Sequence, residues 1–105
     1  MSAVALCEES LALRRELGDE GGVAMSLNTL GVVARNRGDL TAARTLYEES
    51  LGLFRELGDQ WGIGLLLNNL ARVARDLGDW TWTVELCAES LALFREAATA
   101  ANRRR

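Results

Sequence analysis

The sequence predicts an all-α protein, an α-solenoid of about five helices that pack as antiparallel hairpins. Three observations predict it. The 105-residue sequence repeats with a period of forty, the dipeptide Gly-Asp recurs every twenty residues, and apolar residues between these pairs follow helical spacing. There is also no proline to interrupt a helix. A repeat of this length indicates an array of similar helical units, each burying its apolar face against its neighbours.

Two kinds of segment alternate along the chain. LCEESLALRRELGD at 6–19 returns as LYEESLGLFRELGD at 46–59, with eleven of fourteen positions identical, and again as LCAESLALFREAAT at 86–99. LNTLGVVARNRGD at 27–39 returns as LNNLARVARDLGD at 67–79, with eight of thirteen positions identical. We call helices of the 27–39 kind first-type (A) and those of the 6–19 kind second-type (B). The order is therefore B-A-B-A-B, two full repeats with a leading half.

Each Gly-Asp pair predicts a turn between two helices. Glycine reaches the left-handed conformation that ends a helix, and the Asp that follows accepts from free N–H groups at the start of the next one. Connections this short make neighbouring helices antiparallel. The pairs at 18–19, 38–39, 58–59 and 78–79 predict helices near 2–17, 20–37, 40–57, 60–77 and 80–98. We expect a single repeat domain over 1–98 and a frayed tail over 99–105.

Apolar side chains recur at helical spacing within these segments, so each helix has a face to bury. They are Leu6, Leu11, Leu13 and Leu17 in the first helix, Leu27, Leu30, Val33 and Ala34 in the second, and Leu46, Leu53, Phe54 and Leu57 in the third.

Composition argues against several classes of protein. Histidine is absent, which removes the usual general base near neutral pH, and no nucleophile–base pair, metal cluster or Gly-rich phosphate loop is present; we expect no enzyme and no cofactor. The longest apolar run is far short of the roughly 20 residues of a membrane span, and MSAVALCEES lacks a secretion-signal layout, so we expect a cytoplasmic protein with no membrane contact. Residues 1–102 carry nine Arg against fifteen acidic residues, which disfavours direct nucleic-acid binding.

In detail the two helix types resemble the tetratricopeptide repeat family, over about residues 3 to 97. The forty-residue period and LNNLA at 67–71 resemble its longer subclass, found in kinesin light chains and in the sensor regions of bacterial transcriptional regulators. The residues that carry the family resemblance are small ones where helices cross, a large ring in the seam and a Leu-Gly pair: Gly31, Ala43 and Ala71, Tyr47, and Leu30-Gly31.

The resemblance implies a protein–protein interaction module that holds a peptide or protein in a concave groove lined by the first-type helices. Amide and guanidinium groups on such a face suit an acidic or carboxyl-ended peptide. The alternative is that these polar residues only form a solvated face; the recurrence of Asn at 28 and 68 favours binding, because Asn is a poor helix former. The groove positions are Met25, Asn28, Val32 and Arg35 on one helix and Leu65, Asn68, Arg72 and Arg75 on the other.

Cys7, Tyr47 and Cys87 occupy the same place in successive repeats. We expect all three to fill the same buried slot between helices, with both cysteines reduced and unreactive.

Three tryptophans, Trp61, Trp80 and Trp82, lie near the starts of the last two helices. Packing at the end of the seam is one interpretation, and an anchor at a protein interface, where Trp is enriched, is the other.

The ends of the array carry apolar residues that call for a neighbour, among them Leu6 and Leu11. We expect either an excerpt from a longer array or a homo-oligomer, most simply a twofold dimer joined through its terminal helices. Two alternatives to the peptide groove therefore stay open. One is a structural, self-assembling element; the other is a regulatory segment of a larger signalling or transcriptional protein.

Overall fold

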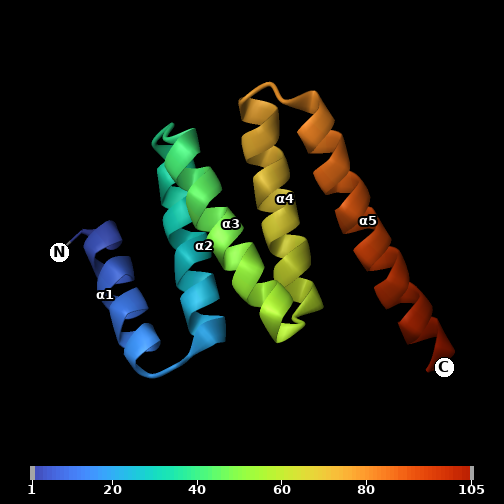
Figure 1. The fold of residues 1–105 in the computed structure, drawn as a ribbon, viewed down its shortest axis with the longest axis horizontal. Coiled ribbons are helices and arrows are strands. Elements are labelled where there is room, and N and C mark those ends of the chain that lie inside the picture. Colours follow the sequence, from blue (N-terminus) through green and yellow to red (C-terminus); the bar gives the residue numbers. More distant parts are fainter. Residues whose placement is uncertain (1, 105) are drawn as a thin grey trace.

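Five helices form the computed structural model of the chain, which describes residues 2–104 (Figure 1). Consecutive helices run antiparallel and pack against one another in chain order, and α2 and α3 overlap in this view of a molecule of 48 × 36 × 18 Å. The predicted solenoid of helical hairpins is confirmed, and the first four helices begin and end within one residue of the expected bounds. The helices are α1 (Ala3–Glu16), α2 (Glu20–Asn36), α3 (Leu40–Leu57), α4 (Gln60–Asp76) and α5 (Trp80–Arg103).

The four predicted turns have the expected geometry. Every glycine of a Gly-Asp pair has a positive φ, between 66 and 82°. The Asp side chain that follows accepts a hydrogen bond from the backbone N–H three residues on, at 2.9 to 3.0 Å. Ending one helix and capping the next thus takes two adjacent residues, because the glycine supplies the backbone conformation and the carboxylate supplies the acceptor.

Helix α5 runs to Arg103, so the predicted helix end at 98 is wrong. Ala98 and Thr99 stand where Gly58 and Asp59 stand one repeat earlier. Alanine favours the helix and cannot easily adopt a positive φ, and the Thr99 hydroxyl donates to the Arg95 carbonyl within the helix at 2.9 Å. Without a signal to stop, the helix continues through residues that we expected to fray.

The core lies along the central helices. Its largest fully buried side chains come from α2, α3 and α4: Tyr47, Phe54, Leu27, Leu66, Leu67, Leu70 and Val73. The terminal helices each contribute one buried residue, Leu11 in α1 and Leu86 in α5. Burial is therefore concentrated where a helix has a neighbour on each side.

None of the five helices is both long and apolar enough to cross a membrane.

The predicted common slot for Cys7, Tyr47 and Cys87 is wrong for both cysteines. Tyr47 is 1% exposed, but Cys7 is only half-buried and Cys87 is exposed. The reason is position in the array, because α3 lies between two first-type helices, whereas α1 and α5 each contact one in the structure. The slot is closed only in the middle of the row.

The tryptophans differ in their surroundings. Trp82 packs against the main core cluster, with the Arg44 guanidinium 4.3 Å from its ring centroid. That cation–π contact joins the start of α3 to the start of α5. Trp61 and Trp80 are 67% and 64% exposed. Packing is therefore the role of Trp82, and Trp61 and Trp80 stay candidates for an interface.

Candidate interaction surface

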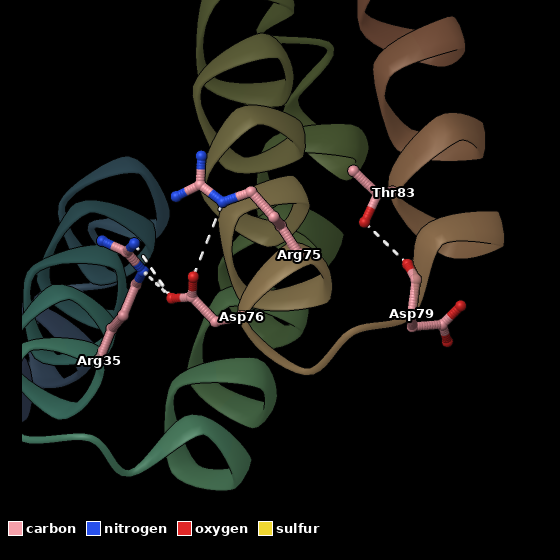
Figure 2. Close-up of polar contacts among 5 residues, drawn as sticks. All are labelled: Arg35, Arg75, Asp76, Asp79 and Thr83. Carbon is pink, nitrogen blue, oxygen red and sulfur yellow. Dashed lines mark hydrogen bonds and ion pairs between the residues drawn. The ribbon is translucent and has the colours of Figure 1, made fainter.

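Two of the predicted groove arginines converge on one carboxylate (Figure 2). Arg35 reaches from α2 to Asp76 at the end of α4, with its Nε and its terminal nitrogen each 3.1 Å from the carboxylate. Arg75 approaches the other oxygen of Asp76 from the same helix, with Nε 3.7 Å away. The structure thus brings Arg35 and Arg75 to one carboxylate; Asp76, which sequence reasoning missed, is hydrogen-bonded to Arg35 and within ion-pair distance of Arg75. The repeat gives a signal at this position, because Asp76 replaces Asn36 of the preceding first-type helix.

Arg72 is exposed, and its charge acts on the phenol of Tyr47 together with that of Arg35. Burial raises the pKa of Tyr47 above its usual value, and the charges of Arg35 and Arg72 act against that rise. The ring of Tyr47 lies against Gly31, whose missing side chain leaves room for it. The charges of one guanidinium on α2 and one on α4 therefore both act on the same buried phenol of α3.

The raised pKa of Tyr47 predicts a loss of stability at alkaline pH. Below about pH 10 Tyr47 is protonated in both the folded and the unfolded chain; above it the unfolded chain releases the proton first, so the free energy of unfolding falls. Urea titrations at increasing pH measure this fall, and tyrosinate absorbance reports the group directly because Tyr47 is the only tyrosine. Tyr47→Phe should remove the part of the fall due to this group. Tyrosinate forming at the same pH with and without urea would contradict the prediction.

The two asparagines predicted to line the groove lie in different environments. Asn28 is 8% exposed, and its side-chain oxygen accepts from the Asn69 amide of α4 at 2.7 Å. Asn68 is exposed and lines a hollow between α4 and α5. Asn28 is therefore buried and links two helices, whereas Asn68 is open to solvent. Sequence reasoning missed Asn69, although the Asn-Asn doublet of α4, in place of Asn-Thr in α2, was a visible signal.

The apolar groove positions are partly covered. Met25 and Leu65 are half-buried and pack against the core, and Val32 is 38% exposed. The surface available to a ligand is therefore narrower than the predicted stripe. It consists of Val32, Asn68, Arg72 and Arg75, with Arg35 half-buried beside them; we call these five residues the arginine surface.

Comparison with protein families gives a match over most of the chain. Family models described as tetratricopeptide repeat match residues 1–56 and residues 65–102. Comparison with curated proteins gives no match.

Proposed function

Because the chain belongs to the tetratricopeptide repeat family, whose repeats generally mediate protein–protein interaction, we propose that its arginine surface binds an acidic peptide segment of a partner protein. The proposed site of action is the cytoplasm, and neither a cofactor nor catalysis is part of the proposal. The long-period subclass suggested by the sequence stays a prediction.

The observation that carries the proposal is the charge of this surface. Within residues 2–104, Arg35 and Arg75 pair with one carboxylate, that of Asp76, and together with Arg72 they therefore leave an excess of two positive charges on a chain whose net charge is −3. Arg72 has no ion-pair partner within residues 2–104. Guanidinium binds carboxylate through two parallel hydrogen bonds, and Arg35 is held in place by Asp76 before any ligand arrives.

The test uses a glutamate-rich peptide with a free carboxyl terminus, and its glutamine-substituted, amidated counterpart as the neutral probe. We expect Arg72→Ala to raise the Kd of the acidic peptide about tenfold or more, since a hydrogen bond to a charged group contributes about 1.5–3 kcal/mol. Asn68→Ala should raise it less. Isothermal titration calorimetry measures both values, and added salt should weaken the binding of the wild-type chain.

The matched control is Arg37→Ala, which removes an exposed arginine at the end of α2 that the arginine surface does not include. Its Kd should stay close to that of the wild type. Equal affinity of the wild-type and Arg72→Ala chains, or equal affinity for the acidic and neutral peptides, would overturn the proposal.

A second proposed function is self-association through the terminal helices. The observation that favours it is their exposed apolar side chains. In α1, Leu6 and Leu13 are each 54% exposed, and in α5, Leu91 and Phe94 are 50% and 56% exposed. Apolar faces of this kind gain free energy when another surface covers them.

A further inference from the structure

Helices α1 and α5 are close copies of each other in sequence. LCEESLALRRE at 6–16 and LCAESLALFRE at 86–96 are identical at nine of eleven positions. They nevertheless use different faces, because the first-type helix that α1 packs on is the one that follows it, whereas the first-type helix that α5 packs on is the one that precedes it. Leu11 of α1 is 8% exposed and packs with Val23 and Leu27 of α2, whereas Leu91, its counterpart in α5, is 50% exposed. The face of α5 that carries Leu91 thus corresponds to the face by which α1 binds α2; in α5 it is half exposed and borders a hollow beside α4.

The middle of the molecule shows how such a face is covered. Helix α3 has the same sequence type and packs on both sides, with the ring of Phe54 lying against Gly62 in the first turn of α4. Leu51 is 6% exposed there, and Phe54 is 2% exposed. Between the first-type helices, Asn28 and Asn69 are hydrogen-bonded. Contact between a second-type helix and the next first-type helix therefore includes a leucine and an aromatic ring on a glycine, and a polar pair joins the two first-type helices on either side.

Helix α2 also has a glycine on which an aromatic ring could pack, but no aromatic ring of the same chain lies there. Gly22 stands where Gly62 stands in α4, and the Arg14 side chain lies against it in place of an aromatic ring. Phe94 of α5 occupies the position of Arg14 two repeats later; the end of its ring lies against Gly64 of α4, and 56% of the residue is exposed. A helix with the sequence of α5 would therefore cover the start of α2 with more apolar surface than α1 does.

The ion pairs between second-type helices also support placing α5 on α2. Arg15 of α1 pairs with Glu49 of α3 at 3.2 Å, and Arg55 pairs with Glu89 in the same way one repeat later. Arg95 is the third member of this arginine series, and no ion pair joins it to the rest of residues 2–104. An α5 helix placed on α2 would bring Arg95 to the position from which Arg15 reaches Glu49.

We propose that α5 of one copy replaces α1 of a second copy on α2, joining the copies head to tail by helix exchange. The proposal rests on the self-association proposed above and replaces the expected twofold dimer with an open-ended joint. Phe94 would cover Gly22 of the second copy, and Leu91 would take the place of Leu11. Helix α4 of the first copy would then lie beside α2 of the second, with Asn68 opposite Thr29, the counterpart of Asn69.

Exchange gives up the contacts that hold α1 in place, which include the Arg15–Glu49 ion pair that Arg95 would replace. Leu11 is the one buried residue of α1, and Arg14 donates hydrogen bonds to the Gly22 carbonyl at 2.9 Å and to the Ser26 hydroxyl at 3.0 Å. The exchanged joint replaces these two bonds with burial of an aromatic ring and adds contact between two first-type helices. A joint between unlike surfaces does not close, so the assembly grows as concentration rises.

Sedimentation velocity of the full chain over a concentration series tests the joint. We expect the average mass to pass that of a dimer without a plateau. Leu91→Glu should weaken association roughly 100-fold or more, because it removes a buried leucine and places a charge in the joint. Leu13→Glu is the control, since Leu13 is exposed to a similar extent but lies on α1, which the exchange displaces, and it should leave association unchanged. Circular dichroism checks that both variants are folded, and Phe94→Ala is a second variant, expected to weaken association less.

A capture experiment separates exchange from a symmetric dimer. Tagged Leu91→Glu chains keep the seat on α2, so they should capture the α5 of untagged wild-type chains, whereas a twofold contact between two α5 helices requires Leu91 on both sides and predicts no capture. Absence of capture, or an oligomer that Leu13→Glu abolishes and Leu91→Glu does not, overturns the exchange and leaves self-association standing. A wild-type chain that stays a monomer at every concentration overturns both.

Discussion

Replacing Phe54 by alanine is expected to lower the free energy of unfolding by about 3–5 kcal/mol. The ring is 2% exposed and lies between α3 and the first turn of α4. Its neighbour on α4 is Gly62, which has no side chain to move into the space, so the cavity stays largely open. Urea unfolding followed by circular dichroism at neutral pH measures the change. A loss of this size is a large fraction of the roughly 5–15 kcal/mol that stabilises a typical domain.

The matched control is Phe94→Ala, the same residue type at the corresponding position of α5. Phe94 is 56% exposed, so at dilute protein concentration we expect a loss of about 1 kcal/mol or less. The comparison isolates position in the array, because the two helices share most of their sequence. Similar losses for the two variants would mean that the next first-type helix does not create the burial of Phe54.

The helices and turns could be predicted from the sequence because their signals are local. A Gly-Asp pair determines the end of one helix and the cap of the next without help from the rest of the chain. The same rule explains the one boundary that was wrong, since residues 98–99 lack the pair and α5 continues to Arg103.

Contacts between helices could not be read from the period. The groove stripe was assigned by matching positions forty residues apart, but the polar contacts from α2 to α4 join residues 41 apart, Arg35 to Asp76 and Asn28 to Asn69. Which residues meet depends on how two helices are rotated and offset, and that follows from packing and not from the repeat itself. Residues forty apart therefore occupy equivalent positions on their helices, but the residues that contact one another are not the equivalent ones.

The burial of residues in the terminal helices also could not be predicted from the repeat. Cys7 and Cys87 occupy the position of Tyr47, yet they are half-buried and exposed. A repeated sequence predicts which face of a helix is apolar, but it does not state whether a neighbour covers that face. In a solenoid each unit contacts only its neighbours, so two near-identical helices can differ fully in exposure.

Gly31→Ala is expected to lower the free energy of unfolding by about 1–3 kcal/mol, as overpacked cores do. In an ordinary helix the same change would raise it, since alanine is the better helix former by about 1 kcal/mol. Here the new Cβ would lie 2.5 Å from Cε1 of the buried Tyr47 ring, so the ring or the helix must move. Gly52→Ala is the control with the opposite expected effect, because nothing lies within 4 Å of a Cβ at Gly52 in the middle of α3. We expect it to raise the free energy of unfolding by about 0.5–1 kcal/mol. Thermal or urea unfolding measures both.

The chain itself suggests how the Gly31 clash can be relieved. One repeat later Ala71 stands in place of Gly31, and Cys87 stands in place of Tyr47. A small side chain on the first-type helix thus accompanies a small one on the second-type helix. We expect Tyr47→Cys to cost less stability in the Gly31→Ala background than in the wild type, which a double-mutant cycle measures as a coupling energy. Additive losses of stability would mean that residues 31 and 47 do not compete for the same space. Contact with the Tyr47 ring would then not be the reason for glycine at position 31.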